Sequence, residues 1–229
     1  MCICVVMENI YFDPKHSASF GGVRRLKEAL PVTQRKKALE WLQSQRAYTL
    51  HKPARKKFVT RKTRTTHHNS QWQADLNDMM TYKEGSYRYI LTVIDVFSRY
   101  AWVRALKTKT GEEMVEAFES IFQKGKCPHF LQTDQGTEFE NKKFQAFLRR
   151  WGVKHFSVKS PYKSGMVERF NRTLKTRMFR YFTHVGHYKW VNVLPDLVDS
   201  YNRSAHRFQI FLFRHFLFTK FKFFLIFFI

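Results

Sequence analysis

Residues 87–97 read YRYILTVIDVF, an almost unbroken apolar run that is rich in β-branched and aromatic side chains. A run of this length and composition is typical of a strand buried at the centre of a sheet. Strand patterns flank it at residues 71–79 and, after the turn at Ser98 and Arg99, at residues 100–106. The sequence therefore predicts that the sheet begins with three consecutive strands.

Farther along the chain, helical and strand patterns alternate. The predicted elements are a helix at 111–123, a strand at 129–133, a helix at 141–151, a strand at 153–158, a helix at 164–182 and a helix at 188–203. Pro195 is expected to bend or interrupt the last helix, because proline lacks the N–H that an internal helical position needs. Three strands followed by alternating helices and strands predict an α/β fold, a mixed five-stranded sheet flanked by helices.

The chain carries far more basic than acidic side chains. Its 229 residues include 41 Lys and Arg against 18 Asp and Glu, a net charge of +23, and 17% of the residues are aromatic. The aromatic content excludes a fully disordered chain, and the charge indicates a polyanionic partner, either nucleic acid or an anionic membrane surface. Three cysteines cannot form a disulfide framework, which favours a reducing compartment such as the cytosol or nucleus.

The N-terminal region, residues 1–62, contains the densest positive charge. Residues 35–64 hold eleven Lys and Arg, with Glu40 as the one acidic residue. Two short helices are predicted over residues 21–50, followed by the basic stretch HKPARKKF at residues 51–58. The pattern fits a small helix-turn-helix-like DNA-binding unit, and it fits equally a solvated basic linker with two amphipathic helices.

Residues 208–229 depart from the rest of the sequence. They hold ten of the 24 phenylalanines and show neither turn residues nor a helical or strand period. Arg214, Lys220 and Lys222 interrupt the segment and would be costly inside a bilayer, so we do not predict a membrane anchor. The composition is that of translated A+T-rich non-coding sequence, and we expect that this tail is not native domain sequence.

Three acidic residues lie where a carboxylate is costly unless something compensates it. Asp75 is in the middle of the first strand, Asp134 follows the fourth, and Glu168 is early in the long helix. Three convergent carboxylates can hold two Mg²⁺ ions while leaving positions open for water and phosphate. Asp95, at the end of the central strand, is predicted to cap the following turn instead.

The long helix has two distinct faces. Val167, Phe170, Leu174 and Met178 recur at three- and four-residue steps, which predicts a buried face. Four polar residues recur on the neighbouring face: Glu168, Asn171, Arg172 and Lys175. We therefore expect the helix to present one carboxylate beside an amide and two cations that suit phosphate, although the two cations alone would also fit a solvated helix face.

The sequences around these acids resemble one known family. The matching phrases are QWQADL (71–76), YILTVIDVFSRYAWVRALKTKT (89–110), LQTDQGTEF (131–139) and VERFNRTLK (167–175). They are similar to the catalytic core of retroviral-type integrases, in the DDE transposase class, over about residues 63–207. The upstream phrases YFDPKHSASFGGV and EWLQSQRAYTLHKPARKKF look closest to integrases of Polinton/Maverick-type transposons and to host genes derived from them.

This resemblance implies an RNase H-like fold and metal-dependent 3′-end processing and strand transfer of DNA. By motif position, Asp75, Asp134 and Glu168 would be the catalytic residues and would bind two Mg²⁺ or Mn²⁺ ions. The 33 residues between Asp134 and Glu168 are slightly fewer than in the retroviral pattern, a difference that falls most naturally in the loop 158–164. The His-His-Cys-Cys zinc arrangement of retroviral integrases is absent from the sequence, so no zinc is predicted.

Together these patterns divide the chain into a basic N-terminal region (1–62), an RNase H-like integrase core (63–207) and the Phe-rich tail (208–229). Side chains expected to contact DNA are Lys159, Lys163, Asn171, Arg172, Lys175, Arg55, Lys56 and Lys57. The expected partners are transposon ends, target DNA and further copies of the chain, but no membrane, and the expected location is the nucleus.

Two alternatives stay open. One is a C-terminally truncated, transposon-derived DNA-binding protein whose catalysis is unused. The other is an RNase H-like nuclease that acts on RNA–DNA hybrids, which the basic N-terminal region and the integrase-like phrases disfavour.

Overall fold

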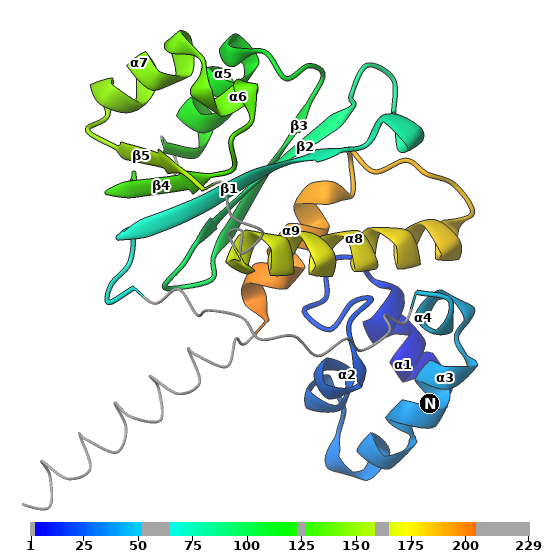
Figure 1. The fold of residues 1–229 in the computed structure, drawn as a ribbon. Coiled ribbons are helices and arrows are strands. Elements are labelled where there is room, and N and C mark those ends of the chain that lie inside the picture. The colour runs from blue at the N-terminus through cyan, green and yellow to red at the C-terminus, as the bar shows by residue number, and fades with distance from the viewer. Residues whose placement is uncertain (1–2, 52–64, 123–126, 159–164, 205–229) are drawn as a thin grey trace, which may run out of the picture.

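The computed structural model describes residues 3–51, 65–122, 127–158 and 165–204, which include a five-stranded mixed sheet (Figure 1). Its strands, in the order β3-β2-β1-β4-β5, are β1 (Gln71–Asp78), β2 (Tyr89–Asp95), β3 (Ala101–Leu106), β4 (Phe130–Thr133) and β5 (Lys154–Ser157). β2 pairs antiparallel with β1 and β3, whereas β4 pairs parallel with β1 and β5. The predicted sheet is confirmed.

The central strand and its turn follow the sequence pattern. β2 is buried at every position after Tyr89. At its end, the Asp95 carboxylate accepts hydrogen bonds from the Phe97 N–H (3.3 Å) and from the Ser98 N–H (3.1 Å) and hydroxyl (2.6 Å). Asp95 therefore caps the β2–β3 turn, as its position predicted.

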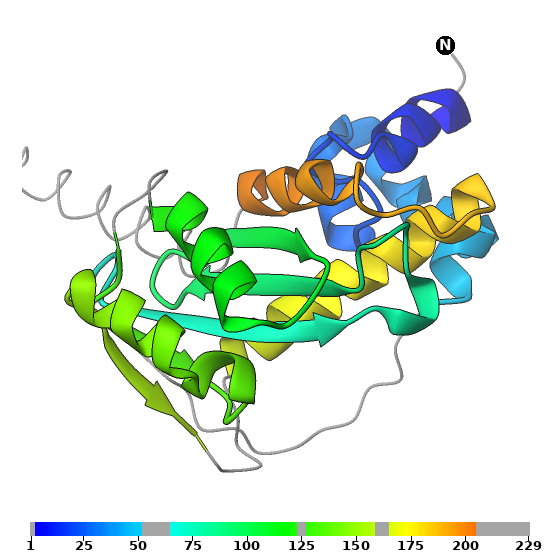
Figure 2. The same ribbon diagram turned by 90° about the horizontal axis from the view of Figure 1, so that it is seen from above.

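Helices cover both faces of the sheet (Figures 1 and 2). The helices are α1 (Ile3–Phe12), α2 (Val23–Ala29), α3 (Ala38–Ser44), α4 (Arg46–Thr49), α5 (Gly111–Phe122), α6 (Thr137–Glu140), α7 (Lys142–Arg150), α8 (Gly165–Val185) and α9 (Leu194–Arg203), with 3₁₀ turns η1 (Val32–Lys37) and η2 (Met80–Tyr82). α5, α6 and α7 share one buried core with the sheet, and α8 and α9 share a second core with its other face. None of the helices within the described ranges combines the length and the apolar character needed to span a membrane.

The last helix corrects one expectation. We expected a helix over residues 188–203 that Pro195 would bend or interrupt, but α9 begins at Leu194 with Pro195 in its first turn. The first turn suits proline, because N–H groups there have no partner within the helix and the fixed proline φ is already helical. Pro195 therefore marks where the helix starts.

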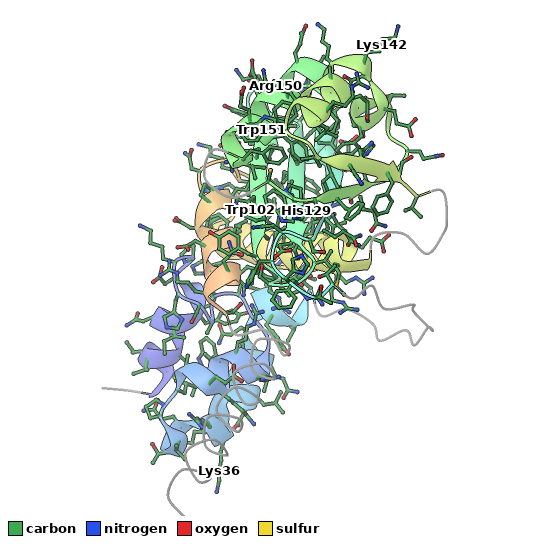
Figure 3. All side chains as sticks on the ribbon, turned by 90° about the vertical axis from the view of Figure 1, so that its left-hand side faces the viewer. Lys36, Trp102, His129, Lys142, Arg150 and Trp151 are labelled. Atoms are coloured by element: carbon green, nitrogen blue, oxygen red, sulfur yellow. The ribbon has the colours of Figure 1, made fainter. Side chains whose placement is uncertain are left out.

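The N-terminal helices pack directly on α8. Tyr11, Phe20 and Trp41 belong to the same buried cluster as Met178 and Phe182 of α8. Figure 3 shows the resulting length of the molecule, with Lys36 at one end and Lys142, Arg150 and Trp151 at the other.

A buried arginine stabilises the packing of the N-terminal helices on α8. Arg180 of α8 donates hydrogen bonds to the carbonyl oxygens of Phe20 (2.7 Å) and Gly21 (2.9 Å). Its guanidinium lies 4.7 Å from the centre of the Tyr48 ring, a cation–π arrangement. The helix that carries Glu168 is therefore also the docking surface of the N-terminal helices.

Candidate active site

The three predicted acids come from three elements that a buried glutamine network joins. Gln73 of β1 and Gln132 of β4 lie opposite each other in the parallel register. The Gln73 Nε2 donates to the Gln132 Oε1 at 3.0 Å, and the Gln71 Nε2 donates to the same oxygen at 2.6 Å. Because Asp75 and Asp134 each follow two residues later, the register carries both acids toward the same end of two adjacent strands.

The same network fixes the start of α8. The Gln73 Oε1 accepts hydrogen bonds from the N–H groups of Met166 (3.1 Å) and Val167 (3.2 Å). N–H groups in the first turn of a helix need such partners from outside the helix. Gln73 thus caps α8 next to Glu168 and sets the position of that residue relative to β1.

Gln73 and Gln132 were not predicted from the sequence. Their positions in the sequence could have indicated them, because each glutamine lies two residues before a predicted acid and therefore on the same face of the strand as that acid. A buried amide there needs hydrogen-bond partners from a neighbouring element.

An open cleft of about 520 Å³ runs along one face of α8. It is lined by Asp75, Glu168, Asn171, Arg172, Lys175, His51, Asn77, Thr176 and Phe179. The first five are residues that the sequence singled out, and the structure brings them together. The other four were not predicted, and His51 comes from the N-terminal region.

The Asp75 side chain is held in one orientation. Its Oδ2 accepts a hydrogen bond from the Asn171 Nδ2 at 2.7 Å, and its Oδ1 accepts from the Leu76 N–H at 3.0 Å. The backbone oxygen of Asp75 accepts from the buried Thr92 hydroxyl at 3.1 Å. Asn171, which we expected to contact DNA, is thus a direct partner of the central carboxylate.

Asp134 lies at the end of β4 and is not among the residues that line the cleft. Its Oδ1 accepts a hydrogen bond from the Gly136 N–H at 3.3 Å. Its backbone oxygen accepts from the Thr133 hydroxyl at 2.7 Å, and that hydroxyl also contacts the His155 Nε2 at 2.9 Å. Hydrogen bonds from both sides therefore hold the backbone at this strand end.

His155 belongs to a further chain of contacts behind Asp134. Its Nδ1 accepts a hydrogen bond from the Gln145 Nε2 at 2.8 Å, so its Nε2 carries the proton and donates to Thr133. Burial lowers the pKa of His155 below its ordinary value, and the nearby Glu140 opposes that shift. The imidazole is therefore neutral near pH 7 and serves as a bridge between α7 and β4.

The donor set suits a hard divalent cation. Asp75 and Glu168 place two carboxylates on one solvent-open cleft, and carboxylate oxygens are the ligands that Mg²⁺ prefers. Across the described residues, no three His, Cys, Asp or Glu side chains lie close enough together to hold a metal ion. The structure therefore brings two of the three predicted ligands, Asp75 and Glu168, into one cleft, while Asp134 lies at the end of the neighbouring strand β4.

The remaining predicted contacts fall outside the described residues. These are Lys159 and Lys163, in the segment before α8, and Arg55, Lys56 and Lys57, in the segment after the N-terminal helices. Their expected roles stay predictions.

Comparison with known proteins identifies the segment that contains the sheet. Residues 65–164 match the family model described as the integrase core domain. A transposon-derived protein of Caenorhabditis elegans is 39% identical over 120 residues, which cover 52% of this chain and 42% of that protein. The Gag-Pol polyprotein of Gibbon ape leukemia virus is 31% identical over 144 residues, covering 61% of this chain and 8% of the polyprotein. The chain thus spans less than half the length of these relatives.

Solved structures share the fold. The HTLV-2 integrase catalytic core domain, solved with magnesium in a dimeric form, matches 60% of this chain and 89% of that chain, with a TM-score of 0.51 and 25% identity. The simian T-cell lymphotropic virus intasome, solved with a PP2A regulatory subunit, contains a chain that matches 84% of this one over 69% of its own length. Its TM-score is 0.56 and its identity is 22%. The fold is the RNase H-like fold of integrase catalytic cores, and residues 65–164 of this chain match the integrase core domain and are similar to retroviral and transposon-derived proteins.

Proposed function

We propose that this chain is a transposon-derived DNA integrase that carries out metal-dependent 3′-end processing and strand transfer. The observation that carries the proposal is the meeting of Asp75 and Glu168 in one cleft that Arg172 and Lys175 also line. On an integrase core fold, this places two carboxylates beside two cations that suit phosphate. The net charge of +23 supports a nucleic-acid substrate.

Five residues of the cleft have a role in this proposal. Asp75 and Glu168, with Asp134 from the neighbouring strand end, would hold two Mg²⁺ or Mn²⁺ ions. When bound, the metal supplies activation of the attacking oxygen and stabilisation of the leaving oxygen. Asn171 orients the Asp75 carboxylate through its 2.7 Å hydrogen bond. Arg172 and Lys175 bind the phosphates next to the reacting one.

The remaining parts of the proposal concern partners. The substrates are transposon ends and target DNA, the chain acts as a homo-oligomer, and it works in the nucleus. The magnesium and the dimeric form of the HTLV-2 catalytic core support the metal and the self-association, and the C. elegans relative supports the transposon origin. A relation to the Polinton/Maverick group rests on the upstream phrases alone.

One observation favours a second candidate, a DNA-binding protein whose catalysis is unused. Within the described residues the third carboxylate, Asp134, does not line the cleft with the other two. A chain that binds DNA through its basic surface without cutting it would fit that arrangement.

A cleavage assay separates the two candidates. The full chain is incubated with labelled duplex ends in Mg²⁺ or Mn²⁺, with Glu168→Gln and Asp75→Asn in parallel. We expect metal-dependent nicking and strand transfer that both variants reduce to background, because each removes a ligand charge. Glu116→Gln, the same change at an exposed site on α5, is the matched control and should leave nicking intact. Tight DNA binding without nicking on any end tested would favour the second candidate.

A further inference from the structure

The cleft continues along α8 beyond the carboxylates. Four of its lining residues follow one another at steps of four, three and four positions: Glu168, Arg172, Lys175 and Phe179. Such spacing puts them in one stripe on the helix, about 16 Å long at the helical rise. The stripe leads from a carboxylate, past two cations, to an aromatic ring.

The N-terminal region supplies a second ring at the far end of this stripe. His51 follows α4, which packs against α8, and its ring centre lies 5.8 Å from that of Phe179. The His51 Nε2 is 2.7 Å from the Thr183 Oγ1, and that hydroxyl donates its single proton to the Phe179 carbonyl oxygen at 2.9 Å. The His51 Nε2 must therefore carry a proton and donate it to Thr183, which fixes the plane of the ring.

His51 offers an aromatic face rather than a charge. Burial lowers the pKa of its imidazole, and the positive charge of Arg180 lowers it further. The ring is therefore neutral near pH 7. In this part of the cleft the positive charge comes from Arg172 and Lys175, and the aromatic surface comes from His51 and Phe179.

We infer that this end of the cleft binds an unpaired nucleotide of the DNA strand, with its base against the rings of His51 and Phe179. The inference rests on the proposed function and specifies its substrate, a DNA end with an unpaired strand. Bases inside a duplex stack on one another, whereas an unpaired base exposes a face on which an aromatic side chain can stack. A basic groove that ends in aromatic side chains is the usual design for holding single strands.

The test compares two DNA ends in a buffer without divalent metal, so that binding is measured apart from cleavage. One end is a blunt duplex, and the other is the same duplex with a three-nucleotide unpaired 5′ tail that carries 2-aminopurine. For the full chain we expect tighter binding of the tailed end and quenching of the 2-aminopurine fluorescence on binding. His51→Ala should weaken binding of the tailed end about tenfold and relieve the quenching, with little effect on the blunt end.

Matched variants make the result specific. His51→Phe keeps an aromatic face and should keep the preference for the tail, which a purely structural role of His51 would not predict. His129→Ala, the same truncation at an exposed site, should bind like the wild type. Arg172→Gln should flatten the salt dependence of binding, whereas His51→Ala should not, because His51 neutralises no phosphate.

The outcomes also separate this inference from the proposed function. If the chain nicks DNA but binds tailed and blunt ends equally, or if His51→Ala keeps the preference, the inference is wrong and the proposed function stands. If the chain binds neither end, both are wrong.

Discussion

At the scale of single residues, the contacts behind Asp134 predict a pH dependence of stability. Because burial holds the pKa of His155 below its ordinary value, the unfolded chain binds a proton more readily than the folded one as the pH falls through about 6.5. The stabilisation that the neutral, buried His155 ring gives the folded chain is complete above that pH and is lost progressively below it. In His155→Gln the loss of unfolding free energy between about pH 7.5 and 5.5 should be smaller than in the wild type, because the Gln side chain does not titrate.

Urea denaturation at several pH values measures this effect. The wild type also contains His51 and His184, whose pKa values burial lowers as well, so the difference between wild type and variant isolates His155. His129→Gln is the control, because His129 is exposed on the surface (Figure 3). A pH profile that His155→Gln leaves unchanged would contradict the bridging role.

The sequence anticipated some individual residues and missed others for a physical reason. The buried face of α8, including Phe170 and Met178, followed from periodicity and is buried. Gln73 and His51 were not predicted, because their roles depend on partners about 90 and 130 residues away in the chain. No local pattern encodes which distant backbone N–H or hydroxyl a buried amide or imidazole will meet.

At the scale of elements, Gln73 should set the position of α8. Gln73→Met removes the acceptor for two N–H groups in the first turn of α8 and the donor to Gln132. Leaving buried polar groups without partners should cost about 2 kcal/mol of unfolding free energy. Under the proposed function, nicking should fall further than the stability loss explains, because Glu168 lies in this same first turn.

Urea denaturation and the nicking assay, both run at a temperature where the variant is folded, provide the measurement. Gln43→Met, the same substitution at an exposed position of α3, should change neither. Wild-type nicking by a destabilised Gln73→Met would show that Gln73 supports the fold without positioning Glu168.

The strands and the longer helices after residue 70 were predictable, whereas α1, α6 and the start of α9 were not. An almost unbroken apolar run located β2, and apolar residues at three- and four-residue steps located α8. The predicted start of α9 was wrong. In the sequence a proline looks the same whether it interrupts a helix or lies in the first turn of one. Tertiary packing decides between those two outcomes.

At the scale of the whole molecule, the charge predicts how DNA binding responds to salt. Each phosphate contact neutralised by a cation contributes about 0.9 to the slope of log affinity against log salt. Replacing Arg55, Lys56 and Lys57 together with Gln should therefore flatten the slope by about 2 to 3. Fluorescence anisotropy over a salt series measures it.

Neutralising two cations at a second surface tests whether position matters. Lys142→Gln with Arg149→Gln removes charge from α7, at the opposite end of the molecule from the N-terminal helices (Figures 1 and 3). This pair should leave the slope nearly unchanged. Equal flattening of the slope per charge removed by the two sets of variants would mean that DNA binding has no preferred face.

The docking of the N-terminal helices on α8 could not be read from the sequence. Charge and short helices suggested either a DNA-binding unit or a linker, and neither interpretation contained the contact between Arg180 and the Phe20 carbonyl oxygen. Deleting the region would also uncover apolar side chains of α8, such as Met178 and Phe182, that share its core. Substituting surface charges is therefore the cleaner way to probe its role in DNA binding.

Because two faces of α8 make different contacts, the length of this helix is constrained. One side of the helix faces the cleft with Glu168 and Arg172, and another side holds the N-terminal helices through Arg180. Inserting or deleting one codon between Arg172 and Arg180 would turn one set by about 100° relative to the other. Such a length change would separate the two surfaces even if every residue were kept, so we expect this stretch to tolerate substitutions far better than insertions or deletions.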